Sequence, residues 1–250
     1  MNEKNLVWGK NPVIEILEQC PSRINKIYIQ ENISLDNRLK KIIELAKLNK
    51  IVIEKTHLKK LQTLVGEDVS FQKVVASTTS IEYMDLEDFL AIEKNDYKRL
   101  LILDSIQDPH NFGAIIRTAA AAGLDGIVVA NHRSAPITSV VEKISSGAIN
   151  HIPIIKTTSL SACIDTLKKH DYWVIATQMQ AKDNYFEIDY SDMNFAIVMG
   201  SEGSGISKTI LNKADFTIKI MSNFESLNVS AACAVIVYEA MRQIYIKNKK

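Results

Sequence analysis

The feature that constrains the fold most is a regular alternation, from Arg99 onward, of short apolar segments and longer segments with helical periodicity. The apolar segments are almost continuously hydrophobic, which is typical of strands buried on both faces of a parallel sheet. Their alternation with helices predicts an α/β fold, in which helices cover both faces of the sheet. The expected strands are 100–103, 126–130, 152–155, 173–176, 195–199 and 216–220, and the expected helices are 112–122, 137–145, 160–170, 206–212 and 229–246.

The first 77 residues have a different order of elements and predict a separate small α/β domain. Asn11 and Pro12 favour the start of a helix, with Asn as N-cap and Pro at the first helical position. The acidic, weakly patterned residues 78–98 then predict a linker that contains a short helical piece near 86–92. The predicted domains are 1–77 and 99–250. Within the first, we expect helices at 11–19, 35–48 and 56–65, and strands at 24–30, 51–54 and 73–77.

Composition and cysteine spacing exclude several classes of protein. The chain is 46% hydrophobic and 24% charged, which is ordinary for a globular protein. Its net charge is only +1, but residues 1–76 carry 13 basic and 9 acidic side chains, which suits a polyanionic partner. The three cysteines lie far apart, which argues against a disulfide framework or a zinc site and favours a reducing compartment. We therefore expect a cytoplasmic protein without a bound metal or a membrane partner.

Polar residues gather at three junctions between an expected strand and an expected helix. The junctions are residues 111–119, 199–205 and 226–230. In an open α/β sheet, ligands bind beyond the carboxyl ends of the strands, so these segments predict one site built from distant parts of the chain. Each junction also has a purely structural interpretation. Asn111 could cap a helix that begins at Phe112, and Ser226 and Asn228 could cap the last helix. Glu202 could interact favourably with the positive N-terminal end of the helix that follows it.

Arg117 and the glycines after Met199 carry more information than a helix cap does. Arg117 is the only charged residue between Asn111 and Leu124, so its guanidinium either reaches solvent or binds a planar anion such as phosphate. Three glycines in six residues, 200–205, indicate unusual turns or a close approach of the backbone to a ligand. Their spacing is neither that of a Walker A loop nor that of a Rossmann fingerprint.

Taken together, the three junctions resemble the motifs of the SpoU/TrmH family of RNA ribose 2′-O-methyltransferases, within the SPOUT class. Residues 108–119 match the first motif, 199–207 the second, and 226–240 the third. The segment 7–13 is similar to the opening of relatives that methylate a guanosine of large-subunit (23S-type) ribosomal RNA. The N-terminal part also has the size of their ribosomal-protein-like RNA-binding domain.

The resemblance implies S-adenosylmethionine as the methyl donor, a C-terminal trefoil knot, ribosomal RNA as substrate, and a homodimer with the active site near its interface. General rules of chain topology would by themselves argue against a knot. Motif matching implies two sets of site residues. The catalytic and RNA-positioning set is Asn111, Arg117, Glu202, Ser226 and Asn228, and the cofactor-binding set is Gly200, Ile218, Ile220 and Leu227.

Within that resemblance, we expect Arg117 to bind a phosphate and stabilise charge on the attacking oxygen, and Glu202 to orient it. The sequence departs from the usual motifs at 218–222 and at 71–73, which leaves the RNA target open. Two alternatives remain: methylation of transfer RNA, and an RNA-binding or assembly factor that has lost catalysis. A nucleotide-binding protein of another kind is disfavoured because the chain lacks both glycine-rich phosphate motifs.

Overall fold

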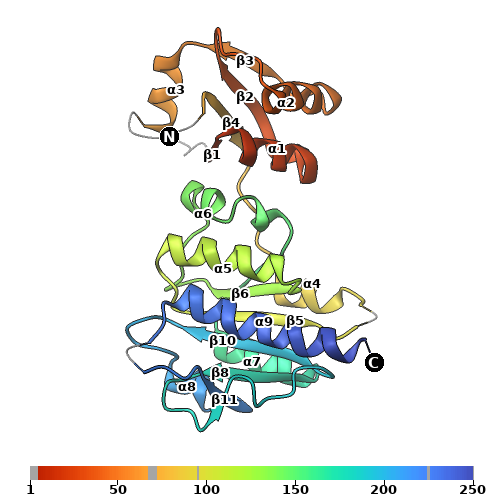
Figure 1. Cartoon of the computed structure of the whole chain (residues 1–250), viewed down its shortest axis with the longest axis vertical. Helices are drawn as coiled ribbons and strands as arrows, with labels where there is room; N and C mark the ends of the chain where they lie inside the picture. Colours follow the sequence, from red (N-terminus) through yellow and green to blue (C-terminus); the bar gives the residue numbers. More distant parts are fainter. Residues whose placement is uncertain (1–4, 67–71, 95, 224–225, 250) are drawn as a thin grey trace. The chain divides into compact units, whose positions relative to one another are not determined.

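A computed structural model describes residues 5–66, 72–94, 96–223 and 226–249 (Figure 1). It divides into two compact units. The first comprises the residues up to Ile81 together with Ile137–His151, and the second comprises Glu82–Pro136 and the residues from Ile152 onward. This division differs from the expected domains at two places, 82–98 and 137–151, because both segments pack against residues distant in sequence.

The first unit is built on a four-stranded sheet of order β1-β4-β2-β3. Strands β1 and β2 are antiparallel to β4, whereas β3 is parallel to β2. Its core forms where apolar faces of α1 and α2 meet the sheet, through residues such as Val13, Ile16 and Ile42. The strands are β1 (Asn5–Trp8), β2 (Ile24–Gln30), β3 (Ile53–Thr56) and β4 (Val74–Thr78), and the helices are α1 (Lys10–Gln19), α2 (Asn37–Leu48), α3 (Leu58–Val65) and α6 (Ser139–Ile144).

Helix α1 begins one residue before the expected cap. Gly9 occupies the N-cap position with φ 100°, a conformation that favours glycine, and no side chain caps the helix there. The prediction that Asn11 is the N-cap is therefore wrong, and Asn11 and Pro12 lie inside the first turn. Strand β1 was not expected at all, because a four-residue edge strand gives little periodicity.

The segment Ile137–His151 joins the first unit through a buried ion pair. The Arg23 guanidinium donates to the Glu142 carboxylate at 3.1 Å and to the Asn150 side-chain oxygen at 2.5 Å. Glu142 is only 7% exposed, and this burial raises the pKa of its carboxyl group although Arg23 opposes the rise. Lys143 lies 5.9 Å from the Trp8 ring centroid, in a cation–π arrangement. Contacts between residues so far apart along the chain cannot be predicted from the local sequence.

The second unit contains a parallel sheet of seven described strands, in the order β7-β6-β5-β10-β8-β11-β9. Every neighbouring pair runs parallel, which confirms the predicted parallel sheet of an α/β fold. The short β9 was not predicted. The strands are β5 (Arg99–Asp104), β6 (Gly126–Ala130), β7 (Ile154–Thr157), β8 (Tyr172–Thr177), β9 (Asp183–Asn184), β10 (Asn194–Gly200) and β11 (Phe216–Lys219).

Helices cover both faces of this sheet. One face packs against α4, α7 and α8, and the residues of α4 that do so, Leu86 and Phe89, explain why 82–98 is part of the unit rather than a free linker. On the other face, α5 and α9 lie against each other in front of the central strands (Figure 1). The helices are α4 (Leu86–Ala91), α5 (Pro109–Ala121), α7 (Leu160–Lys169), α8 (Lys208–Leu211) and α9 (Val229–Lys247).

Helix α9 is the one helix among the described residues that is long and apolar enough to cross a membrane, judged by length and composition alone. A core helix of a soluble protein passes the same test. In this chain α9 buries Cys233, Ile236, Val237 and Ala240 and packs against α5 and β10.

Candidate functional site

Three of the predicted site residues meet at the carboxyl edge of the parallel sheet. The Asn228 side-chain amide donates to the Glu202 carboxylate at 2.6 Å and to the Asn111 side-chain oxygen at 2.9 Å. The Asn111 amide donates to the same Glu202 oxygen at 3.2 Å. The three junctions therefore come together in the structure through these three residues, which we call the carboxylate cluster.

The caps of α5 and α9 leave the amides of the cluster available. Asp108, not Asn111, is the N-cap of α5, since its carboxylate accepts from the backbone N–H groups of His110 and Asn111. The prediction of an Asn111 cap and a helix start at Phe112 is wrong. Asn228 does cap α9, as predicted, but through its side-chain oxygen, which accepts from Ser230 N at 2.9 Å. Its NH₂ group remains free to bind Glu202 and Asn111.

Glu202 is presented by a tight turn after β10. A Cβ atom at Gly200 would lie 2.3 Å from the carbonyl carbon of Gly205, so the close approach of the two backbone segments requires glycine there. Ser201 forms a bridge to Gly205, whose φ of 64° is left-handed. The sequence-based reading of these glycines as a tight backbone turn thus has a direct steric cause.

The charge of Glu202 is held in place by neutral donors. One carboxylate oxygen accepts from the two amides described above and from Val229 N at 3.3 Å. The residue is exposed, and no lysine, arginine or histidine in the described part of the chain forms an ion pair with it. The cluster is therefore a fixed, uncompensated negative charge at the sheet edge.

The other two members of the predicted catalytic set are not in the cluster. Arg117 lies six residues beyond Asn111 on α5, exposed, and makes no hydrogen bond or ion pair with any described residue. Ser226 is exposed just before α9 and likewise lacks a hydrogen-bond partner among the described residues. Their roles stay predictions.

The residues predicted to hold a cofactor border the same edge. Gly200 ends β10, and Ile218 is fully buried on β11, where its carbonyl oxygen accepts from Gln178 N at 2.9 Å. Ile220 is half-buried, and Leu227 is 42% exposed. Strands β10 and β11 lie on either side of β8, so these positions flank the end of that strand.

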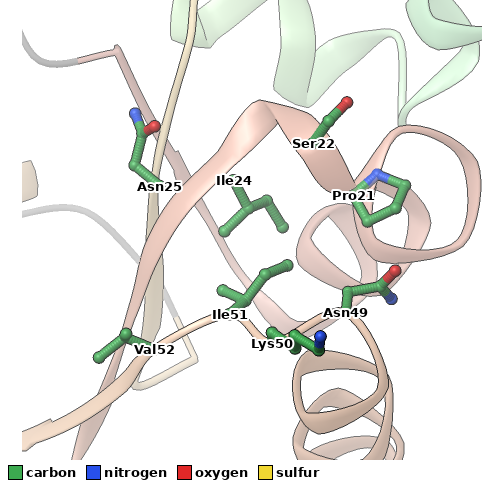
Figure 2. Close-up of a pocket in the computed structure, with 8 residues that line it drawn as sticks. All are labelled: Pro21, Ser22, Ile24, Asn25, Asn49, Lys50, Ile51 and Val52. Atoms are coloured by element: carbon green, nitrogen blue, oxygen red, sulfur yellow. The ribbon is translucent and has the colours of Figure 1, made fainter.

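Sequence reasoning missed a cavity of about 470 Å³ at the carboxyl ends of β5 and β6. The signal was a polar segment, 131–134, that follows β6 just as the motifs follow their strands. A second cavity, of about 390 Å³, lies in the first unit where β2 begins and α2 ends (Figure 2). The first is lined by Asp104, Ser105, Ala130, His132, Arg133, Thr158, Leu160, Ser161, Ser204, Gly205, Ser207, Thr209 and Ile210, and the second by Pro21, Ser22, Ile24, Asn25, Asn49, Lys50, Ile51 and Val52.

No metal centre is found among the described residues, and two of the three thiols are buried. No group of three or more His, Cys, Asp or Glu side chains there could hold a metal ion. Burial raises the pKa of the Cys163 and Cys233 thiols to about 12, so both are protonated and unreactive near neutral pH.

Two family models match almost the whole chain. The SpoU rRNA methylase family matches residues 98–238, and the RNA 2′-O ribose methyltransferase substrate-binding domain matches residues 6–84. The chain belongs to the SpoU family of RNA methyltransferases. It is 38% identical over 245 residues to a putative TrmH family tRNA/rRNA methyltransferase of Staphylococcus saprophyticus, with 96% of both chains covered. It is also 38% identical to the similarly named YacO of Bacillus subtilis, again over 96% of both chains.

Solved structures of this family share the fold. An rRNA methyltransferase from Sinorhizobium meliloti superposes with a TM-score of 0.80 at 23% identity, over 97% of this chain and 88% of that one. The SpoU methyltransferase AviRb from Streptomyces viridochromogenes, solved in complex with AdoMet, gives 0.78 at 22% identity, over 96% and 90%. A TrmH/SpoU tRNA-modifying enzyme from A. aeolicus gives 0.56 at 30% identity, over 64% and 81%.

Proposed function

We propose that this SpoU-family protein transfers a methyl group from S-adenosylmethionine to the ribose 2′-hydroxyl of one nucleotide in RNA. The observation that carries the proposal is the carboxylate cluster, in which Asn111, Glu202 and Asn228 come from three separate motifs and bind one another. A factor that had lost catalysis would have no need for this constellation. A rigid site suits a reaction whose rate depends on holding two reactants at attack distance.

The residues at the predicted cofactor positions fit S-adenosylmethionine. Gly200, Ile218, Ile220 and Leu227 carry no charged or polar side chain, so they offer backbone groups and apolar surface. Exposed Met221 adds apolar surface beside them. Such a set suits an adenine and its ribose, whereas a cofactor with phosphates would find no countercharge at these four positions. When bound, S-adenosylmethionine supplies a methyl carbon that is electrophilic because it is attached to a sulfonium.

Arg117 is the residue that we assign to the reacting oxygen. Its guanidinium has no partner among the described residues, so it is available to an RNA phosphate and to the negative charge that develops on the 2′-oxygen. A guanidinium remains protonated, so Arg117 acts as an electrostatic group rather than as the base. Glu202, with Asn111, Asn228 and Ser226 nearby in sequence or space, orients the arginine or a ribose hydroxyl.

As substrate we propose a guanosine of large-subunit ribosomal RNA, with transfer RNA as the alternative. The match of residues 6–84 to a substrate-binding domain supports a separate domain that recognises a large RNA. Relatives of similar identity carry names that include both tRNA and rRNA, which keeps the alternative open.

We further propose a cytoplasmic homodimer whose C-terminal part is tied in a trefoil knot. Support for the dimer comes from α9, where Val235, Tyr238 and Tyr245 remain between 37% and 60% exposed. Support for the knot comes from the match of residues 98–238 to the SpoU rRNA methylase family.

Nucleoside mass spectrometry tests the reaction and the target together. Ribosomal and transfer RNA from cells that lack the gene are incubated with the purified protein and S-adenosylmethionine, and Arg117→Ala serves as the control. One new 2′-O-methylguanosine in large-subunit RNA alone supports the whole proposal. A gain only in transfer RNA would replace the target, and RNA binding without any gain would favour the assembly factor.

A further inference from the structure

The cavity at the ends of β5 and β6 has the composition of an anion site. It is lined by two basic side chains, His132 and Arg133, from the segment after β6. Both are exposed, and neither forms an ion pair or a hydrogen bond with another described residue. Cations without a protein partner at the wall of a cavity are available to a ligand.

Hydroxyl groups complete the lining. The side-chain oxygens of Thr158, Ser161, Ser207 and Thr209 have no hydrogen-bond partner among the residues that the structure describes. Ser161 lies in the first turn of the ten-residue helix α7, where backbone N–H groups and the helix dipole add positive potential. The cavity thus offers many donors that nothing in the described protein uses.

The one carboxylate of the cavity is withdrawn from it. Asp104 is 8% exposed, and its two oxygens accept from the Ser105 hydroxyl at 3.1 Å and from Ser207 N at 2.8 Å. Both oxygens therefore bind protein donors in the wall of the cavity, and the exposed side chains of the lining are basic or neutral.

The cavity and the carboxylate cluster share the turn after β10. Glu202 of this turn belongs to the cluster, whereas Ser204, Gly205 and Ser207 line the cavity. The end of β5 likewise contributes Asp104 to the cavity and leads directly to α5, which carries Asn111. An RNA strand whose reacting ribose lies at the cluster would therefore continue toward the cavity along one edge of the sheet.

We propose that this cavity binds a backbone phosphate of the substrate RNA next to the nucleotide that is methylated, with Arg133 as its main contact. This proposal rests on the proposed function, because it takes RNA as the substrate. It adds a second phosphate site to the one assigned to Arg117, and residues of the Glu202 turn line this second site. Two separated phosphate contacts would fix the direction of the strand across the cluster.

Arg133→Asn tests this site without adding backbone strain. Arg133 has a φ of 65°, and asparagine tolerates this left-handed conformation better than most residues. The matched control is Lys208→Gln, since Lys208 is an exposed cation between two lining residues, lies outside the lining, and forms no ion pair with a described residue. Circular dichroism verifies that each variant is folded, and Ser161→Ala provides a second lining change.

The readout is the Kd for a fragment of the substrate RNA that contains the target nucleotide, measured by fluorescence anisotropy at several salt concentrations. We expect Arg133→Asn to raise the Kd about tenfold and to reduce the slope of log K against log salt by about 0.7, the loss of one phosphate contact. Ser161→Ala should raise the Kd two- to threefold, and Lys208→Gln less than twofold. Equal Kd values for Arg133→Asn and Lys208→Gln would overturn the proposal.

Methylphosphonate substitution of the RNA, one position at a time, identifies the phosphate. At one position near the target, removing the charge should weaken binding to the wild-type protein but not to Arg133→Asn. If no position behaves so, while Arg133→Asn weakens the binding of inorganic phosphate, the cavity holds a free anion and the RNA assignment is wrong. Methylation of the same fragment by the wild-type protein reports separately on the proposed function.

Discussion

Two glutamates, one in each unit, show how differently this chain treats a carboxylate. Glu142 is 7% exposed and faces the Arg23 guanidinium at 3.1 Å, whereas Glu202 is exposed and is held by the N–H groups of Asn111, Asn228 and Val229. The first is neutralised and serves packing, because a buried charge needs a counterion. The second keeps its charge but loses its freedom to move, which is useful only where a cation or a polar ligand arrives from outside.

The largest effect should follow from removing Arg117, the cation that we assign to the reacting oxygen. We expect Arg117→Ala to lower kcat/KM about a thousandfold, as for the loss of a main donor to a developing oxyanion. Since Arg117 has no partner among the described residues, the melting temperature should stay within about 1 °C of wild type. Single-turnover methylation and calorimetry measure the two effects. Activity within a few-fold of wild type would remove Arg117 from the site.

The next effect should come from Glu202 itself. Glu202→Gln keeps an oxygen that can accept from Asn111 and Asn228 but removes the charge, and Glu202→Ala removes both. We expect about a hundredfold loss of kcat for Glu202→Ala. A smaller loss for Glu202→Gln would mean that the hydrogen bonds matter more than the charge. Similar losses for both variants would assign the effect to the charge.

A smaller effect on both stability and activity is expected at Asn228. Asn228→Ala loses the cap of α9 and should lower the free energy of unfolding by about 1 kcal/mol. Asn228→Asp keeps the capping oxygen but replaces the donor with a second carboxylate near Glu202. We expect Asn228→Asp to unfold close to wild type while losing at least tenfold in kcat. Denaturant titration and single-turnover assays of both variants would separate the two roles.

The smallest effect concerns the pH dependence of the Glu142 pair. Burial raises the pKa of Glu142 above its value in the unfolded chain. The folded state therefore loses stability as the pH rises from the unfolded pKa through the raised folded pKa, where Glu142 ionises. Glu142→Gln has no such cost and can still accept from Arg23. We expect the melting temperature of Glu142→Gln, relative to wild type, to rise by roughly 2 °C between pH 4 and pH 7. A constant difference would mean that Arg23 fully compensates the burial.

The sequence predicted the parallel sheet and the three residues of the cluster well, because both depend on local signals. A continuous apolar run predicts a buried strand, and a polar residue directly after it lies at the sheet edge. Local signals do not show which side chain caps a helix or which distant residues form an ion pair. Asp108 precedes Asn111 by three residues and takes the cap that was assigned to Asn111. The Arg23–Glu142 pair joins residues separated by 119 positions, so the place of 137–151 in the first unit could not be predicted.

The cavity was missed for a related reason. Its hydroxyls come from three separate segments, 105, 158–161 and 204–209, and a lone serine or threonine carries no distinctive signal in any of them. Only the placement of β5, β6 and the Glu202 turn along one edge makes them a group.

The double use of Asn228 also limits how this protein can change over evolutionary time. Its side-chain oxygen caps the 19-residue helix α9, and its NH₂ group donates to Glu202 of the carboxylate cluster. A descendant that abandoned methyl transfer could exchange this asparagine for aspartate or serine and keep its fold, whereas an active lineage has no such freedom. The residue aligned with position 228 therefore becomes a marker, within a set of gene duplicates, for which copies have left catalysis behind.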